Sequence, residues 1–388
     1  MDVKQLYDLV NVATKESLGE QALQVDEDLS NLVDLGTEVF NANAKDKYVK
    51  SLVNHIGKVV FVNRKYRGGV PTVLMDGWEF GSVLEKVQMD MPQATENESW
   101  ELEDGASYDP NIFYKPTVSA KFFNSKVTFE VPCSFTDLQV KQSFSNKAQL
   151  NSFVSMIYNA VDKSMTVKLD SLIMRTINNF IGETVYADYA GASLNSKSGT
   201  RAINLLYLYN NTENSGGTAL TAAKALYNKD FLRFASRTMK LYMSRLNKMS
   251  TLFNIGGKER FTPDDVLHVV MIEEFTSAVD TYLESSTFHN DLVALPNYES
   301  VAFWQGSGTD YAFSSTGKID VITSGNHNVA VTGILGVMFD RDALGVCNQD
   351  RRVTSNYNPK AEFTSNWFKW DAAYFNDQNE NFIVFFIA

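Results

Sequence analysis

The sequence predicts an α+β fold that is organised around one long helix, and three observations support this. Residues 148–181 carry apolar side chains at steps of three or four, which is the period of an α-helix. Residues 115–131 instead alternate polar and apolar side chains, which is the period of a β-strand. Helical and strand-like segments then follow one another without a regular βαβ order or an internal repeat.

The segment 148–181 predicts a helix that is roughly 50 Å long at 1.5 Å per residue. Ser145 and Asn146 offer N-cap oxygens, and Gly182 suits the left-handed position just past a helix end. Charges such as Asp162 interrupt the apolar stripe, so the helix is not a membrane span, and the lack of a sustained heptad argues against a coiled coil. We expect a surface spine with one face laid on a sheet.

The composition of the 388-residue chain argues against several classes of function. A net charge of −11 argues against general binding to nucleic acid or to anionic membranes, and no stretch is long and apolar enough to span a membrane. Cys133 and Cys347 are far apart and are expected to be two reduced thiols. The N-terminus has no signal pattern, so we expect the protein to be made in the cytosol.

The N-terminal part is expected to hold helices at Val3–Thr14 and Asp46–Ile56 and a strand at Lys58–Tyr66. Residues 15–34 between the helices are polar and acidic, which leaves two interpretations. They form a solvated arm with little structure, or an arm that packs onto a neighbouring subunit. The second interpretation is favoured by the apolar residues that extend to Phe40, which are unusual for a free tail.

Residues 71–131 form an unusual excursion, in which strand-like arms at 73–91 and 115–131 flank an acidic stretch. No Lys or Arg occurs between Lys86 and Lys115, where seven carboxylates are found: Asp90, Glu96, Glu98, Glu101, Glu103, Asp104 and Asp109. A lone hairpin is only marginally stable in water, so a long one is expected to lie on another subunit.

The acidic run also contains two apolar side chains that could anchor such a contact, Trp100 and Leu102. The candidate subunit-interface residues are therefore Glu98, Trp100, Glu101, Leu102, Glu103 and Asp104. A solvated loop and a calcium site are the alternatives. The calcium site is disfavoured because the run lacks the ligand order and central glycine of an EF-hand loop.

Downstream of the long helix, periodicity predicts a mixed region. Leu205–Tyr209 is expected to be a short strand or a helix fragment. Further helices are expected at 221–228, 230–253 and 273–283, and strands at 266–272, 292–304, 329–339, 344–347, 357–363, 367–375 and 381–387. The polar side of the second of these helices is basic and is interpreted as a solvated face, a contact for acidic residues of a neighbour, or a phosphate contact.

A search for catalytic chemistry finds no constellation, so we expect no catalytic, cofactor or metal site. His268 lies in an apolar strand and is interpreted as a core residue, and His289 and His327 as exposed ones. No His-Glu-x-x-His helix, paired Cys-x-x-Cys, Walker loop or Gly-x-Ser-x-Gly elbow is present.

The order of these elements resembles the major capsid protein of tailed bacteriophages, which has the Hong Kong 97-type fold. Residues 40–62 resemble the arm-to-body segment in capsid proteins of small short-tailed phages of Gram-positive hosts, and Leu150–Asn178 resembles their spine. Residues 333–345 and 379–385 resemble a segment near the C-terminus and the last strand. The resemblance covers nearly the whole chain.

The resemblance implies an N-terminal arm (1–45), an extended loop (71–131), a peripheral domain (46–70, 132–185 with the spine helix, and 351–388) and an axial domain (186–350). It implies a protein that self-assembles as hexamers and pentamers into an icosahedral virion shell, made in the host cytoplasm. Portal protein and a separate scaffolding protein are implied partners. The double-stranded DNA inside is expected to make no sequence-specific contacts. The alternatives are an encapsulin-type cellular compartment of the same fold and a hydrolase whose site was not recognised.

Overall fold

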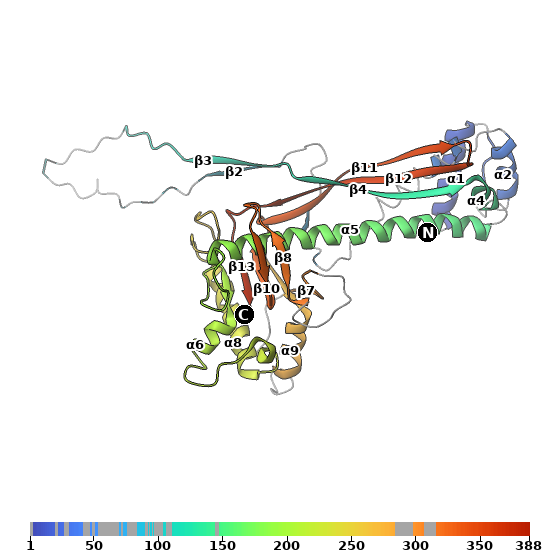
Figure 1. The fold of residues 1–388 in the computed structure, drawn as a ribbon. Coiled ribbons are helices and arrows are strands. Elements are labelled where there is room, and N and C mark those ends of the chain that lie inside the picture. Colours follow the sequence, from blue (N-terminus) through green and yellow to red (C-terminus); the bar gives the residue numbers. More distant parts are fainter. Residues whose placement is uncertain are drawn as a thin grey trace. The chain divides into compact units, whose positions relative to one another are not determined.

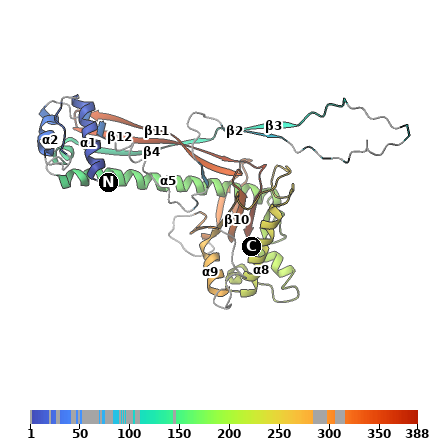
Figure 2. The same cartoon turned by 180° about the vertical axis from the view of Figure 1, so that it is seen from behind.

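A computed structural model gives the fold shown in Figures 1 and 2. It describes residues 3–19, 22–26, 31–41, 47–48, 51–52, 70, 73–75, 84–89, 92, 94, 96, 104–105, 111–143, 147–283, 298–305 and 316–388. The chain divides into two compact units, and each is described by itself. Unit 1 contains residues 1–79, 126–173 and 346–373, and unit 2 contains residues 80–125, 174–345 and 374–388.

The predicted spine is present as helix α5, Lys147–Tyr189, which is longer than expected. The expectation that the helix ends before Gly182 is wrong, because this residue lies inside α5. A Cβ added there would clash with Val321, so the glycine allows a strand to approach the helix closely. The positive φ values that end the helix occur at Ala190 (47°) and Gly191 (80°).

The described residues of unit 1 include the first part of α5, further helices and a four-stranded sheet. The helices are α1 (Val3–Leu18), α2 (Leu32–Asn41) and α4 (Asp137–Ser143). The sheet has the order β1-β11-β12-β4, with β1 at Leu74–Met75, β11 at Leu344–Asn358, β12 at Phe363–Asn376 and β4 at Lys126–Thr136. The first part of α5 runs beside this sheet in both views.

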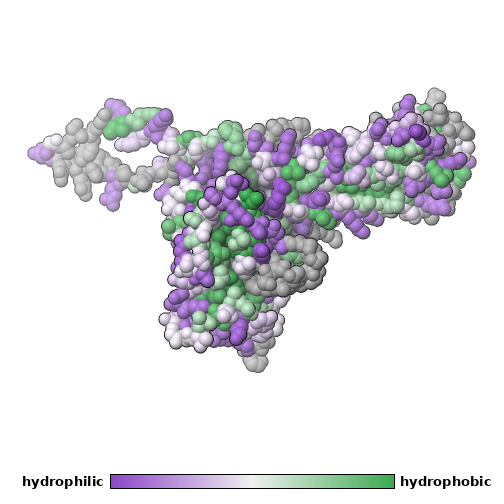
Figure 3. All heavy atoms as spheres, in the orientation of Figure 1, coloured by the Kyte–Doolittle hydropathy of each residue, from purple (hydrophilic) through white to green (hydrophobic). Residues whose placement is uncertain are grey.

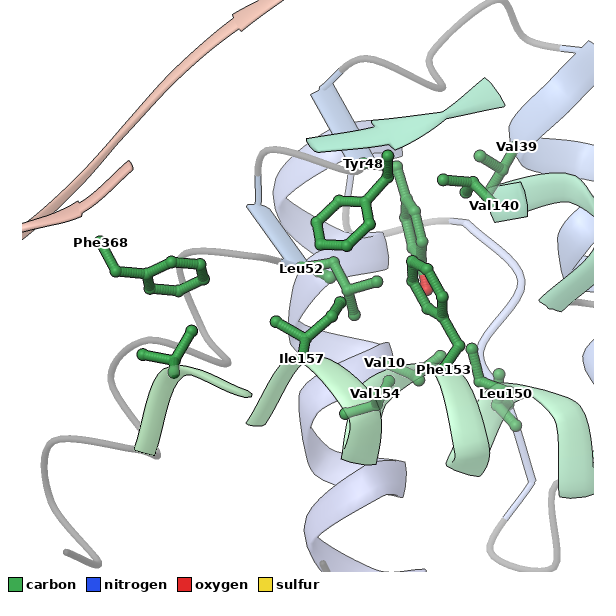
Figure 4. Close-up of a cluster of buried hydrophobic side chains, with 14 of the residues drawn as sticks. Val10, Val39, Tyr48, Leu52, Val140, Leu150, Phe153, Val154, Ile157 and Phe368 are labelled. Atoms are coloured by element: carbon green, nitrogen blue, oxygen red, sulfur yellow. The ribbon is translucent and has the colours of Figure 1, made fainter. Parts of the chain in front are cut away.

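The core of unit 1 lies where the N-terminal helices meet the start of α5 (Figure 4). Val25, Leu35 and Val39 are buried in this cluster. The segment from Val25 to Val39, which includes most of helix α2, therefore packs against other parts of its own chain. Tyr48 and Leu52 are also buried there, in helical segments at 47–48 and 51–52. The expected strand Lys58–Tyr66 lies outside the described residues.

Unit 2 is built on a mixed five-stranded sheet of order β5-β13-β10-β6-β7. Its strands are β5 (Ala202–Asn204), β13 (Phe382–Phe386), β10 (Ile334–Asp340), β6 (Leu267–Ile272) and β7 (Glu299–Val301). The helices are α6 (Leu205–Asn211), α7 (Ala222–Ala225), α8 (Lys229–Leu246) and α9 (Glu273–Leu283). Strands β8 (Ile319–Ile322) and β9 (Asn328–Val331) form a separate hairpin.

Helices cover both faces of this sheet, as the side chains of β13 show. Phe382 stacks on Phe180 of α5 with ring centroids 4.1 Å apart, whereas Phe385 contacts Tyr242 of α8 at 5.6 Å. Successive side chains of a strand point to opposite faces, so α5 and α8 lie on opposite sides of β13. This explains why β13 reads as a continuous apolar run.

Three downstream predictions are corrected. The expected strand 329–339 is divided into β9 and β10 around Gly333, whose φ of 71° interrupts extended backbone. The expected strand 357–363 contains the turn between β11 and β12 instead, where Glu362 has a φ of 48°. The helix expected at 230–253 ends at Leu246.

Candidate assembly site: the β2–β3 hairpin

The extended excursion is represented in the described residues by a two-stranded hairpin of unit 2. Strand β2 (Leu84–Met89) pairs antiparallel with β3 (Val118–Phe123), in a register that places Lys86 opposite Lys121 and Val87 opposite Ala120. The single arm predicted at 115–131 is divided, because β4 leaves the hairpin and pairs with β12. Of the arm predicted at 115–131, residues 118–123 therefore pair in the hairpin, whereas residues 126–131 belong to another sheet.

One face of the hairpin, the inner face, carries polar side chains that contact the rest of unit 2. It presents Lys86, Gln88, Ser119 and Lys121, and at one end also the half-buried apolar pair Leu84 and Phe123. These side chains approach two carboxylates, Asp377 and Glu380, in the turn between β12 and β13.

The contact is an ion cluster with six members: Lys86, Gln88, Lys121, Arg260, Asp377 and Glu380. Lys86 Nζ lies 2.7 Å from Glu380 Oε1 and 3.0 Å from Asp377 Oδ2, and Lys121 Nζ donates to Asp377 Oδ1 at 2.9 Å. Gln88 Nε2 and Arg260 Nε donate to Glu380 Oε1 at 2.9 and 3.3 Å. Arg260 Nη2 also donates to Gln88 Oε1 at 2.6 Å, which closes the network.

The two carboxylates are almost completely removed from water, with side-chain exposures of 0% for Asp377 and 9% for Glu380. Burial alone would raise the pKa of Asp377, but Lys121 and Lys86 hold this pKa below its ordinary value. Burial alone would lower the pKa of Lys86, but Glu380 and then Asp377 raise it overall. Both shifts show that the charged forms are stabilised, so the cluster holds the inner face by ionic contacts.

The opposite face of the hairpin, the outer face, is apolar and exposed to solvent. It presents Val87 (61% exposed), Met89 (52%), Val118 (56%), Phe122 (61%) and Ala120, together with one charged side chain, Glu85, opposite Phe122. Figure 3 shows hydrophobic side chains at the surface of the segment that contains the β2–β3 hairpin. From Lys86 to Met89 and from Val118 to Lys121, the usual arrangement of a half-buried sheet is thus reversed, with polar and charged residues inside and apolar residues outside.

Exposed apolar side chains continue beyond β3 towards the acidic run. Ile112, Phe113 and Tyr114 are 53%, 84% and 81% exposed. Large exposed apolar side chains in such number are typical of an interaction site.

A cleft of about 390 Å³ lies beside the ion cluster, between β2 and the segment that contains Arg260 and Pro263. Three basic residues line it together with three acidic ones, Asp340, Asp342 and Glu380. The opposing charges are balanced, and Asp340 Oδ2 already accepts from Thr262 Oγ1 at 2.8 Å. Nothing in this lining selects a charged ligand.

The candidate interface residues from the sequence fall mostly outside the described part of the chain. Glu98, Trp100, Glu101, Leu102 and Glu103 are not described. Asp104 is described, and it is exposed at a turn next to Gly105, whose φ is 93°. Within the described ranges, no group of three His, Cys, Asp or Glu residues is arranged to hold a metal ion.

The sequence interpretation missed the ion cluster. The alternation of Lys86 and Gln88 with Val87 and Met89 was available as a signal for a two-faced strand. No local signal joins Lys86 to Glu380, because 294 residues separate them.

Comparison with known proteins identifies the family. The sequence matches the family model described as Phi29-like phage major capsid protein over residues 10–386. The chain belongs to this family. The predicted capsid family and the predicted fold type are therefore confirmed, and this capsid protein self-associates into the shell of a virion.

Solved structures agree with this capsid fold. The chain is similar to one in the capsid structure of Staphylococcus phage Andhra, with a TM-score of 0.52 and 10% identity over 84% of this chain and 86% of that chain. It is also similar to a chain in the structure described as head fiber and inner core protein gp22 of native bacteriophage P68, with a TM-score of 0.50, 10% identity and the same coverages. No match to a curated protein was found. None of these matches supports a cellular compartment or a hydrolase.

Two further features of the described residues concern the cysteines and the helices. Cys133 and Cys347 are free thiols. Among the described residues, no helix is long and apolar enough to cross a membrane.

Proposed function

We propose that this capsid protein forms an icosahedral head shell of hexamers and pentamers around the double-stranded DNA of a tailed phage. In this proposal, residues 71–131 of each subunit lie across a neighbouring subunit, and the outer face of the β2–β3 hairpin is the contact surface. The single observation that carries the proposal is the reversed hairpin, whose inner face is fixed by ions and whose outer face is apolar and uncovered.

Burial of the outer face would stabilise a subunit contact substantially. Full burial of one Val, Met or Phe side chain contributes about 1.5–3 kcal/mol, and roughly half of each is still exposed in the single chain. The ion cluster presents these side chains in one orientation, so less conformational freedom is lost on docking.

The remaining roles in this proposal follow the expected division of the chain. Residues 46–70, 132–185 and 351–388 form the peripheral domain, residues 186–350 form the axial domain around the symmetry axes, and residues 1–45 form the arm. The subunits carry no catalytic activity and assemble in the host cytoplasm with a portal and a separate scaffolding protein. DNA is held by confinement and counterions, because in a chain of net charge −11 the acidic residues outnumber the Lys and Arg residues that could bind phosphates.

The test is the double variant Met89→Ser and Phe122→Ser, expressed with the scaffolding protein. Both side chains are exposed, so isolated subunits should keep the circular dichroism spectrum and melting temperature of the natural chain. Shell yield, measured by sedimentation and negative-stain microscopy, should fall by at least about tenfold, which corresponds to about 1.4 kcal/mol lost per contact.

The matched control is Ala120→Ser, which adds a hydroxyl to the same face without removing a large apolar group. Its shells should form normally. Normal yield and melting of shells from the double variant would show that the outer face is not a subunit contact.

A further inference from the structure

Another cleft of unit 2, the α5 cleft, has a volume of about 320 Å³ and lies where strand β8 approaches helix α5. Four segments that are far apart in the sequence line it: the second half of α5, the link between β3 and β4, the β8–β9 turn and the end of β12. All of these belong to unit 2. Ligand pockets measure about 300–1,000 Å³, so the α5 cleft has the size for a small molecule or a single side chain.

Among the described residues that line the α5 cleft, Glu183 is the only charged one. Its Oε1 accepts from the Ser324 N–H at 2.5 Å, which attaches the β8–β9 turn to the helix. Within the described part of the chain, no cation forms an ion pair with Glu183 and no group donates to its Oε2. This half-buried carboxylate therefore keeps the capacity to accept further hydrogen bonds at the cleft.

Two cations contact rings of the cleft wall, but neither neutralises Glu183. Lys121 pairs with Asp377 at 2.9 Å, so its charge is balanced within the ion cluster. Arg175 is exposed and lies 5.2 Å from the ring centroid of Tyr374. It precedes Glu183 by eight residues, or about 12 Å along a helix, which exceeds the Debye length of about 8 Å. A ligand in the cleft therefore meets a net negative charge.

The rest of the lining combines aromatic rings with carboxamides. Phe180 and Phe375 are buried rings of the wall. Asn179 and Asn376 are among the carboxamides. Asn376 Nδ2 donates to the Thr176 carbonyl at 3.2 Å, whereas its Oδ1 is buried and accepts no hydrogen bond from the described residues. Buried amide oxygens normally have a donor, and an N–H group in the cleft would supply one.

We propose that the α5 cleft binds a primary alkylammonium group, with Glu183 as its counter-charge. An ammonium has three donors and no acceptor, which suits a carboxylate oxygen and the oxygens of Asn179 and Asn376. Its hydrocarbon chain packs on the rings, whose faces also attract a cation. An anion is repelled by Glu183, and a neutral ligand would leave this carboxylate without a counter-charge, which is costly.

The proposed ligand would stabilise unit 2. It contacts segments that are joined elsewhere only through the fold, and a ligand that binds the folded state alone raises the melting temperature. The proposal concerns one subunit and does not depend on the shell function stated above.

The test measures the binding of 1,4-diaminobutane to purified full-length subunits by isothermal titration calorimetry and thermal melting. Natural subunits should bind the diamine and melt at a higher temperature in its presence. The neutral analogue 1,4-butanediol and the dianion succinate should bind at least about tenfold more weakly, because neither can form a charge-assisted hydrogen bond to Glu183. No binding of the diamine, or equal binding of diamine and diol, would overturn the proposal.

Glu183→Gln is the decisive variant, because Gln keeps the Oε1 acceptor for Ser324 but removes the charge. Its affinity for the diamine should fall at least about tenfold. The matched control Asp320→Asn removes one exposed carboxylate of β8 that does not line the cleft, and it should bind like the natural chain. Equal loss in both variants would show that general surface charge attracts the diamine, and would overturn the assignment to the cleft.

Asn179→Leu keeps the test decisive if Glu183→Gln does not fold. It removes one carboxamide and fills part of the cleft from a half-buried helix position, so diamine binding should again be lost while the circular dichroism spectrum stays unchanged. Unchanged binding in the folded variant would overturn the proposal.

Two sources could supply the ammonium group, a free amine or a lysine side chain of another protein. Competition between the diamine and Nα-acetyl-lysine amide distinguishes them. Tighter binding of the diamine would assign the cleft to a free amine, and tighter binding of the lysine compound to a side chain. Either result supports the alkylammonium site.

Discussion

Asp377→Asn is the substitution that should test the ion cluster most directly. Its carboxylate lies between Lys86 and Lys121, at 3.0 and 2.9 Å, and its side chain is completely buried. The two lysines are directly opposite each other on neighbouring strands, an arrangement that destabilises a sheet unless a counter-charge intervenes. Asn keeps the shape of the side chain but removes that counter-charge.

The expected cost combines one well-buried pair and one more exposed pair. Removing one partner of a buried ion pair costs about 3–5 kcal/mol. Lys121 is 39% exposed, so solvent screens its pair, and an exposed pair contributes only about 0–1 kcal/mol. Lys86 also keeps Glu380 at 2.7 Å, which limits the loss further. We therefore expect a cost of about 2–3 kcal/mol, concentrated in the attachment of the hairpin.

Amide hydrogen exchange read by mass spectrometry is the suitable assay, because local opening is measured separately from global unfolding. Peptides that cover β2 and β3 should exchange about 30- to 150-fold faster in Asp377→Asn, while β10 and β13 keep their protection. Lys121→Met serves as the matched control and should change the exchange of the hairpin by less than about tenfold. Unchanged exchange of β2 and β3 in Asp377→Asn would refute the argument that the ion cluster holds the hairpin.

Three other outcomes are expected. Gly182→Ala should lower the free energy of unfolding by about 1–3 kcal/mol in thermal or denaturant melts, because its new methyl group clashes with Val321 of β8; an unchanged melt would contradict that packing. Asn228→Ala should cost about 1 kcal/mol in the same assay, because the Asn side chain accepts from the Phe231 N–H at 2.9 Å at the start of α8, whereas Asn228→Asp should cost little. The hairpin attachment should be fully stable only between about pH 4 and pH 10, the ordinary Asp and Lys pKa values. Because the pKa of Asp377 is lowered in the folded protein, the stability that its carboxylate contributes is lost as the pH falls through this lowered pKa. Because the pKa of Lys86 is raised, the stability that its ammonium group contributes is lost as the pH rises through this raised pKa. Protection of β2 and β3, corrected for the intrinsic pH dependence of amide exchange, that stays constant from pH 7 down to the acid unfolding of the whole protein would contradict this.

Periodicity predicted the elements that bury one stripe or one face. The spine was predicted because residues such as Leu150, Ile157 and Leu169 recur at helical spacing and are buried in α5. The helix Glu273–Leu283 was predicted at its observed bounds. The end of the spine was not, because Gly182 was interpreted from its backbone freedom alone. Its actual role is close packing against Val321, and sequence spacing contains no information on that contact.

Strand pairing was the part of the fold that the sequence could not determine. Polar and apolar residues alternate on both sides of residues 124 and 125, in β3, which pairs with β2, and in β4, which pairs with β12. A two-residue period specifies faces but names no partner strand. Asn124 and Ser125 are residues that favour a turn, but a turn signal does not say that the strand after it pairs with a different strand.

The sequence predicted an interface at Glu98–Asp104, which stays a prediction, and it did not predict the ion cluster. The excursion was predicted because seven carboxylates, and no Lys or Arg, lie between Lys86 and Lys115. The predicted interface residues therefore all belong to this acidic run. The ion cluster lies at the other end of the hairpin. Its members come from residues 86 to 380, so that only the folded chain brings them together.

The proposed subunit contact gives a physical reason for the direction of the hairpin faces. For a soluble monomer, the alternation in β2 would place Val87 and Met89 inside and Lys86 outside. The fold does the reverse, and it supplies Asp377 and Glu380 as buried partners for the charged face. Burying that face without the two carboxylates would leave cations unpaired, at a cost of several kcal/mol each. The ion cluster thus allows the apolar face to remain outside, where a second subunit of the shell can cover it.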